Sequence, residues 1–192
     1  MSFNLNRRSF GGLLVASALA RPGLAQTGAY ANPDLLIDPR DLAPLAHLDE
    51  ARTPAYAAEG IVLVDVRPRP DYDAGHIPGA RHLAPDAVSD PASPVGGALR
   101  PMDQIARMFG DLGIDATTRV VFYDDRGGFH AARMLWLAEY MGHLHTGLLN
   151  GGLSAWNSGL APLSGEPARG EAAEFAPART PRRYASADYI LA

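Results

Sequence analysis

Six consecutive residues have the types and spacing best suited to chemistry: Asp124, Asp125, Arg126, Gly127, Gly128 and Phe129. They follow an apolar run, 120–123, that predicts a buried strand, and they lead into a stretch rich in Ala, Met, Leu and Arg, 129–140, that predicts a helix. A glycine-containing loop at a helix N-terminus presents free backbone N–H groups at the positive end of the helix dipole. Such a loop binds anions, and we expect any chemistry of this chain to lie here.

The elements that must position this loop alternate between strands and helices. Short apolar runs predict strands at 34–37, 61–66, 80–83 and 148–149. Helical spacing and capping residues predict helices at 40–48, 101–112 and 153–157, the first of them capped by Asp38 with Pro39 in its first turn. The run 61–66 is almost entirely apolar, which is typical of a parallel strand covered on both faces. This alternation predicts an α/β domain with a mainly parallel sheet flanked by helices.

The composition excludes several kinds of chemistry. The chain has 192 residues, a net charge of −4 and no cysteine, and all 17 basic residues are arginine. Without cysteine there is no disulfide, thiolate–metal site, iron–sulfur cluster or cysteine nucleophile. Without lysine there is no Schiff-base lysine and no P-loop lysine. The mild acidity gives no general reason to expect nucleic-acid binding, and we expect neither a metal nor a cofactor.

Residues 1–25 have the pattern of an export signal. Arg7 and Arg8 supply a charged start, residues 11–20 are weakly apolar, and small residues near position 25 suit cleavage. The segment 6–10 resembles the twin-arginine export motif. An ordinary signal peptide or a lipid-facing anchor is the alternative, although the apolar part is shorter than the ~20 residues that span a bilayer. We therefore expect a cleaved, periplasmic protein without a stable membrane span.

Two regions are expected after the signal. Residues 26–164 contain the predicted strands and helices and should form one folded domain. Residues 165–183 consist mainly of Pro, Ala, Arg and Glu without apolar periodicity, which indicates a linker.

Three segments together resemble the rhodanese (sulfurtransferase) family. Residues 63–80, with an Asp-x-Arg motif and then Tyr-x-x-Gly-His-Ile-Pro-Gly-Ala, resemble one stretch of that family, and residues 149–156, Leu-Asn-Gly-Gly-Leu-x-x-Trp, resemble another. The loop 124–129 lies between them in the fitting place. The matching motif residues are Asp65, Arg67, His76, Gly151, Gly152 and Trp156. The resemblance covers roughly residues 35–163 and implies a single rhodanese-like domain.

The resemblance also implies a lost catalytic group. In that family a cysteine follows the strand that here ends at Tyr123; it takes up sulfur as a persulfide and passes it to cyanide or a thiol. The surrounding N–H groups keep that sulfur anionic. Here Asp124 holds the position, and a carboxylate cannot carry sulfane sulfur. The loop is more similar to that of the non-catalytic N-terminal domain of two-domain thiosulfate or 3-mercaptopyruvate sulfurtransferases, in which the second domain brings the cysteine.

The last residues are similar to an earlier part of the chain. Residues 184–191 resemble residues 36–43, each reading as a short strand, a capping residue and the first turn of a helix. One interpretation is the start of a second domain that is missing from this chain; the other is coincidence in an eight-residue match.

Several residues have more than one interpretation. Asp124 either caps the helix by accepting loop N–H bonds, which we favour, or holds a cation together with Asp125. A haloacid-dehalogenase-like phosphotransferase also places an Asp after an apolar strand, but it needs a second Asp where this chain has Arg126. Arg126 either binds thiosulfate or a carboxylate across a domain interface or is a solvated charge.

The motif residues outside the loop are expected to be structural. Asp65 and Arg67 should form an ion pair or bond neighbouring loops, His76 should stabilise its turn, and Trp156 should pack in the core. His143 and His145 have the spacing of a same-face pair on a strand, but two ligands are too few for a metal site.

The sequence therefore predicts a rhodanese-like domain that is inactive alone. Its expected partner is a cysteine-bearing rhodanese domain, with a small sulfur-containing anion such as thiosulfate or 3-mercaptopyruvate as substrate. The alternative is a stand-alone regulatory or ligand-binding module that uses the loop, vacant without a sulfur group, to recognise a ligand.

Overall fold

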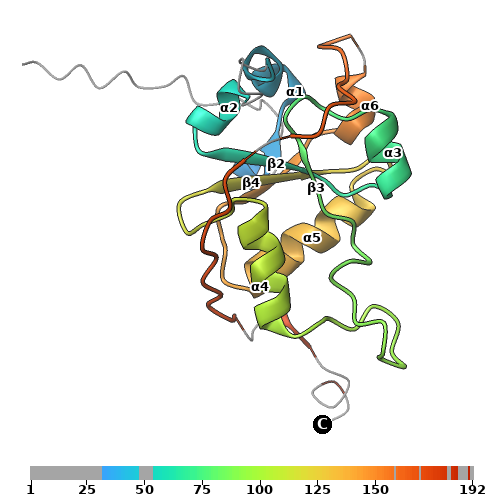
Figure 1. The fold of residues 1–192 in the computed structure, drawn as a ribbon, viewed down its shortest axis with the longest axis vertical. Helices are drawn as coiled ribbons and strands as arrows, with labels where there is room; N and C mark the ends of the chain where they lie inside the picture. The colour runs from blue at the N-terminus through green and yellow to red at the C-terminus, as the bar shows by residue number, and fades with distance from the viewer. Residues whose placement is uncertain are drawn as a thin grey trace, which may run out of the picture.

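A five-stranded parallel sheet forms the centre of the domain (Figure 1). The structure is a computed structural model that describes residues 32–47, 54–157, 159–168, 170–180, 183–185 and 190. The sheet has the order β1-β5-β4-β2-β3, and each neighbouring pair of strands is parallel. Its strands are β1 (Leu36–Ile37), β2 (Ile61–Asp65), β3 (Arg81–His82), β4 (Arg119–Tyr123) and β5 (Thr146–Leu149).

Helices cover both faces of the sheet (Figure 1). The helical elements are η1 (Pro33–Leu35), α1 (Pro39–Leu42), η2 (Ala43–Leu45), α2 (Ala55–Ala58), α3 (Arg69–Ala74), α4 (Met102–Asp111), α5 (Phe129–Tyr140) and α6 (Gly152–Trp156). The helices α4 and α5 pack on one face against Val64 and Phe122, whereas α1, α2 and α6 pack on the other against Leu63 and Val121. Alternate residues of β2 and β4 thus enter opposite cores, which explains their almost continuous apolar sequence.

The strand register brings the motif segments to one edge of the sheet. Asp65, at the end of β2, is paired with Tyr123 at the end of β4, and Phe122 is paired with Leu148 in β5. The segments that follow these three strands therefore emerge side by side. They are the Asp-x-Arg turn, the loop 124–129 and the Gly151–Gly152 turn, and they lie at the carboxyl edge, where parallel sheets place their sites.

The predicted fold class is confirmed, and several element boundaries are wrong. The helix expected at 40–48 is divided into α1 and the short 3₁₀ turn η2. Pro44 explains the division because it lacks the N–H that would continue an α-helix. The strand expected at 34–37 retains only two residues after η1. His143 and His145 precede β5 and lie outside any strand, so the same-face strand pair is wrong.

Residues 165–180 contain no helix or strand in their described part, and they pack along the domain. We call them the C-terminal segment. Ala173 N–H donates to Gly110 O of α4 at 2.9 Å, and Ala178 N–H donates to Met141 O, after α5, at 2.7 Å. The ring of Phe175 is buried and meets Phe109 edge to face at 5.1 Å. A stretch without apolar periodicity is thus bound through backbone groups and one aromatic anchor.

The predicted export signal lies outside the described residues, as does most of the predicted second copy at 184–191. Both remain predictions. Within the described part of the chain, no helix has the length and apolar character needed to span a membrane.

Candidate functional site

The Asp124 carboxylate lies inside the loop and is 1% exposed. Its Oδ1 accepts the backbone N–H groups of Arg126 at 2.9 Å and Gly128 at 2.8 Å. Its Oδ2 accepts those of His130 at 2.8 Å and Ala131 at 3.1 Å. The last two donors belong to the first turn of α5, where no intrahelical acceptor exists. The predicted capping by Asp124 is confirmed, and the loop is not vacant, because a carboxylate of the chain itself fills it.

The four bonds determine the charge state of Asp124. Burial alone raises the pKa of this carboxyl, but the N–H bonds from Ala131, Gly128, Arg126 and His130 outweigh burial and lower it below its ordinary value. The helix dipole of α5 acts in the same direction. Asp124 is therefore ionised at neutral pH, and backbone N–H groups take the place of water around its carboxylate. It has no proton to donate in acid–base chemistry.

Two glycines let the loop wrap around this carboxylate. Gly127 and Gly128 have φ values of +69° and +88°, in the left-handed region that L side chains rarely adopt. A Cβ at either position would meet no atom within 4 Å, so the backbone conformation, not space, requires glycine. Gly128 is the N-cap residue of α5, and its N–H turns inward to Asp124.

The Gly151–Gly152 turn packs directly on the loop. Leu153 N–H donates to Asp124 O at 2.9 Å, and a Cβ on Gly152 would overlap that same carbonyl. Both glycines have positive φ, and Gly151 caps α6. A small pocket of about 150 Å³ remains between the two segments, lined by Asp124, the loop glycines and the Gly151–Gly152 turn. The two sequence motifs thus form one site.

Asp65 and Arg67 form a buried ion pair beside the loop, as predicted. Arg67 Nη2 lies 2.7 Å from Asp65 Oδ2, Arg67 Nε donates to both carboxylate oxygens, and a further Nη2 bond reaches Gly75 O at 2.7 Å. Burial lowers the pKa of Arg67, but the hydrogen bond and charge of Asp65 more than compensate and leave it raised. The adjacent Tyr123 is buried too; burial first, and the charge of Asp65 second, raise its pKa well above the usual value. The pair joins the end of β2 to the turn before His76.

His76 stabilises its turn, as expected. Its ring is fully buried and stacks on Tyr72 at 3.8 Å between centroids. Nδ1 lies 2.9 Å from Tyr72 O, and Nε2 lies 3.0 Å from Glu166 O of the C-terminal segment. Trp156 is also fully buried, in the core beneath α6, so its packing role is confirmed. Neither residue faces the small pocket.

The remaining loop residues form an exposed outer surface. Asp125 and Arg126 approach each other only to 4.0 Å, with exposed side chains. Phe129 is 75% exposed, which is unusual for a phenylalanine, and its ring meets that of His130 edge to face at 5.1 Å. The site therefore has an inner half, in which Asp124 accepts the N–H groups of the loop, and an outer half that presents an aromatic ring and one arginine.

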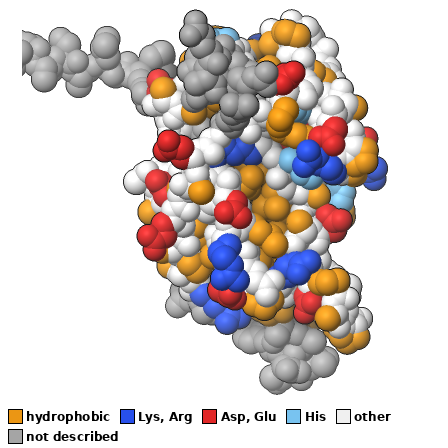
Figure 2. Space-filling view, in the orientation of Figure 1, with side chains coloured by type: hydrophobic (Ala, Val, Ile, Leu, Met, Phe, Trp, Pro, Cys, Tyr) orange, Lys and Arg blue, Asp and Glu red, His pale blue; other side chains and the backbone are white. Residues whose placement is uncertain are grey.

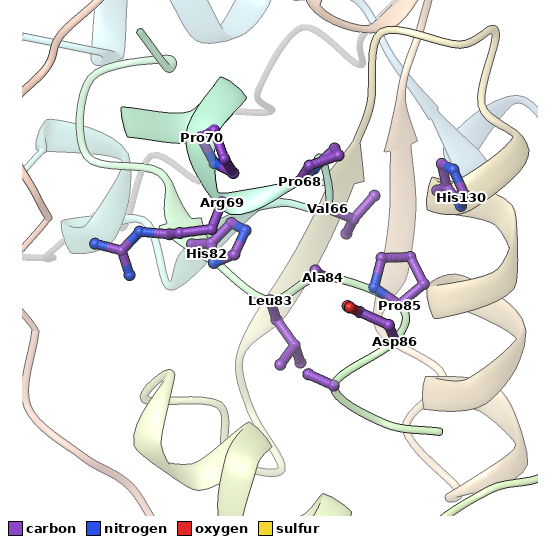
Figure 3. Close-up of a pocket in the computed structure, with 11 residues that line it drawn as sticks. Val66, Pro68, Arg69, Pro70, His82, Leu83, Ala84, Pro85, Asp86 and His130 are labelled. Carbon is purple, nitrogen blue, oxygen red and sulfur yellow. The ribbon is translucent and has the colours of Figure 1, made fainter. Parts of the chain in front are cut away.

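A larger open pocket of about 560 Å³ adjoins this outer half. Figure 3 shows His130 on α5 at one side, His82 and Arg69 at the other, and Val66, Ala84 and Pro85 between them. In Figure 2, hydrophobic side chains gather in the middle of the same face, between α3 and α4, with histidine and basic groups beside them. The sequence did not single out this pocket, because its lining comes from three separate segments without a shared motif.

The described residues give no support to a cation site at the loop. They contain no group of three or more His, Cys, Asp or Glu side chains placed to hold a metal. Both Asp124 oxygens already accept backbone N–H groups, so Asp124 is not available as a cation ligand. This argues against Asp124 and Asp125 as a cation-binding pair.

Comparison with known proteins agrees with this architecture. The family model of the rhodanese-like domain matches residues 48–159, and the chain belongs to that family. Thiosulfate sulfurtransferase of Azotobacter vinelandii is 35% identical over 162 residues, which is 84% of this chain and 56% of the relative. 3-Mercaptopyruvate sulfurtransferase of Rattus norvegicus is 38% identical over 109 residues, or 56% of this chain and 37% of the relative. The chain thus spans about half the length, or less, of these curated relatives.

Solved structures share the fold. The crystal structure of SseA from Escherichia coli superposes with a TM-score of 0.69 at 24% identity, covering 82% of this chain and 60% of that one. Tum1 from Saccharomyces cerevisiae superposes with a TM-score of 0.56 at 21% identity, covering 76% of this chain and 50% of that one. At these identities the likeness concerns the fold alone.

Proposed function

We propose that this domain is the cysteine-free half of a rhodanese-type sulfurtransferase and acts beside a rhodanese domain that carries the cysteine. One observation carries the proposal: the N–H groups that would hold a sulfur anion are bonded to Asp124. A loop filled in this way has no room for a persulfide, and the chain has no thiol to form one. The domain then contributes surface rather than a nucleophile. With its predicted export signal, it would do so in the periplasm.

The reaction assigned to the pair is sulfur transfer from thiosulfate or 3-mercaptopyruvate to a thiophilic acceptor. The partner's thiolate attacks the donor sulfur and becomes a persulfide, as the S–S bond of thiosulfate breaks with release of sulfite, or the C–S bond of 3-mercaptopyruvate breaks with release of pyruvate, whose enolate takes up a proton. The acceptor then removes the terminal sulfur and frees the thiolate. Relatives of which this chain spans about half the length or less, named for these two substrates, support that assignment.

The outer half of the loop supplies the contact surface in this proposal. An exposed aromatic ring beside an open, mostly apolar pocket is the kind of surface that protein partners cover. Phe129 would pack against the partner domain, and Arg126 would face its anionic substrate.

The second candidate function is a stand-alone regulatory module. The exposed side chains of Phe129 and Arg126 support this function as well as they support the split enzyme, because an aromatic ring and a guanidinium also suit a free ligand. A ligand of such a module would bind the outer surface or the small pocket, because the N–H groups of the loop already donate to Asp124. The two candidates differ in whether a cysteine-bearing domain gains activity.

Mixing the chain with a purified cysteine-bearing rhodanese domain should raise thiosulfate:cyanide sulfurtransfer at least tenfold over that domain alone. Thiocyanate formation measures the rate, and calorimetry measures complex formation. Phe129→Ala should remove most of the gain without changing the melting temperature, since the ring is exposed. Leu144→Ala, another exposed apolar residue, located between α5 and β5, is the matched control. If no such domain gains rate or binds the chain, the proposal that this domain is half of a sulfurtransferase is refuted. The stand-alone regulatory module is then the remaining candidate.

Asp124→Cys should restore at most a trace of sulfur loading. The loop is arranged around two carboxylate oxygens that share four donors, and a single sulfur atom cannot reach both pairs. Intact mass after incubation with thiosulfate shows the persulfide as a gain of one sulfur. Stoichiometric loading of this variant would show that the loop is a working anion site that merely lost its nucleophile.

A further inference from the structure

Arg81, on the edge strand β3, has a partly buried guanidinium without a counter-ion. Its Nη1 is fully buried and has no hydrogen-bond partner. In the described part of the chain the ion pairs are formed by other arginines: Arg40, Arg67, Arg69, Arg107, Arg126 and Arg183. Burial of the guanidinium lowers its pKa, and no carboxylate offsets that effect. Because an unpaired buried charge is costly, the structure calls for a negative group near this side chain.

Two glycines leave the space in which this guanidinium lies. A Cβ on Gly113, after α4, would overlap Nη1, and a Cβ on Gly170, in the C-terminal segment, would overlap Nη2. Gly170 has no positive φ, so its backbone would accept a side chain and only the contact with Arg81 requires glycine. The C-terminal segment thus has a glycine at the point where it crosses the Arg81 guanidinium.

A pocket of about 230 Å³ opens beside Arg81. Its lining includes Arg69, Tyr72, His82 and Gly170, with Asp111 as the acidic member. Arg69 uses its Nε to bond Asp73 at 2.8 Å, and a guanidinium has four more N–H donors. In Figure 3 the Arg69 side chain extends away from His130, on the same side as His82. The space is many times the ~10–15 Å³ that one water requires, so a polyatomic ion fits.

We propose that this pocket binds a small oxyanion, of the class of phosphate, sulfate or thiosulfate, between the guanidinium groups of Arg81 and Arg69. A planar guanidinium donates two parallel N–H bonds to two oxygens of one ion, a match that chloride cannot provide. The single carboxylate of Asp111 lowers the net positive charge of the lining but leaves both arginines in place. None of these residues belongs to the loop 124–129. The proposed anion site therefore does not depend on the proposed sulfurtransferase role.

The test is calorimetric titration of the full chain with sodium phosphate, sulfate and thiosulfate, each at constant ionic strength set by chloride. We expect saturable binding of one ion per chain. Arg81→Gln and Arg69→Gln should each weaken it at least tenfold, and Gly170→Ala should weaken it by pushing a methyl group onto the guanidinium. Arg107→Gln, in an exposed ion pair on α4 outside the pocket, is the matched control and should bind as the wild type does.

Three results would overturn the proposal. They are the absence of saturable binding to the wild type, equal binding by a folded Arg81→Gln variant, and binding that Asp124→Asn abolishes while Arg69→Gln preserves it. Should Arg81→Gln fail to fold by circular dichroism, Arg69→Gln and Gly170→Ala decide the matter. Both variants should fold, because the Arg69 side chain is exposed and Gly170 lies outside helices and strands.

Discussion

Asp124→Asn lowers the free energy of unfolding at pH 7 by roughly 3 kcal/mol, because two of the four N–H donors around this buried side chain lose their acceptor. One carboxylate oxygen remains as the amide oxygen and keeps its two bonds. The other becomes an NH₂ group that faces two further N–H donors. Urea denaturation followed by circular dichroism measures the loss. Asp125→Asn, on the exposed side of the same loop, is the matched control and should change stability by less than about 0.5 kcal/mol.

The effect of Asp124→Asn depends on pH in a defined direction. The pKa of Asp124 is lower in the folded than in the unfolded chain, so its contribution is fully present above the unfolded value of about 4. That contribution is lost as the pH falls through the folded pKa. The gap between wild type and variant should therefore be constant from pH 7 to 5 and should narrow below pH ~4. A gap of the same size at pH 7 and at pH 3 would mean that the carboxylate charge contributes nothing.

Arg67→Met lowers the free energy of unfolding by roughly 4 kcal/mol, since it leaves the Asp65 carboxylate buried without its cation. Asp65 is fully buried, and Arg67 supplies its backbone N–H, Nε and Nη2 to the two oxygens. The bond from Arg67 to Gly75 O is lost as well. Equilibrium denaturation of the variant provides the measurement.

Two comparisons isolate the cause of this loss. Arg107→Met removes an exposed i, i+4 pair with Asp103 and should cost no more than about 0.5 kcal/mol. The double variant Asp65→Asn/Arg67→Met should be less destabilised than the sum of its single variants, because the second change removes the unpaired charge. Additive single effects would contradict a coupled pair and indicate two independent packing defects.

The parts of the fold that the sequence predicts are those coded by local pattern. The helix at 129–140 has the predicted ends because a glycine cap precedes it and a run of strong helix formers fills it. The strands β2 and β4 are recognisable because burial on both faces makes them apolar throughout. The capping role of Asp124 follows equally locally, since all four of its donors lie within seven residues of it.

The parts that were not predicted depend on contacts between distant segments. His130 lines the larger pocket only because the fold brings it opposite His82 and Arg69. The burial of Arg81 depends on Gly113 and Gly170, which are far from it in sequence. Phe175 occurs in a stretch whose composition indicates a linker, and one aromatic ring creates no periodicity to detect. The break at Pro44 is the exception, because it follows from the residue itself: proline has no N–H to continue an α-helix.

The C-terminal segment is attached to the domain without being part of its sheet. A local opening of this segment with the five strands still paired would therefore cost only a fraction of the free energy of global unfolding. Such an opening would uncover Phe109 and Arg81 together, because Phe175 covers the one and Gly170 the other. Binding in the Arg81 pocket and order in the segment are then linked, because Gly170 of the segment lines that pocket. Any anion that prefers the closed form would hold the segment down by mass action.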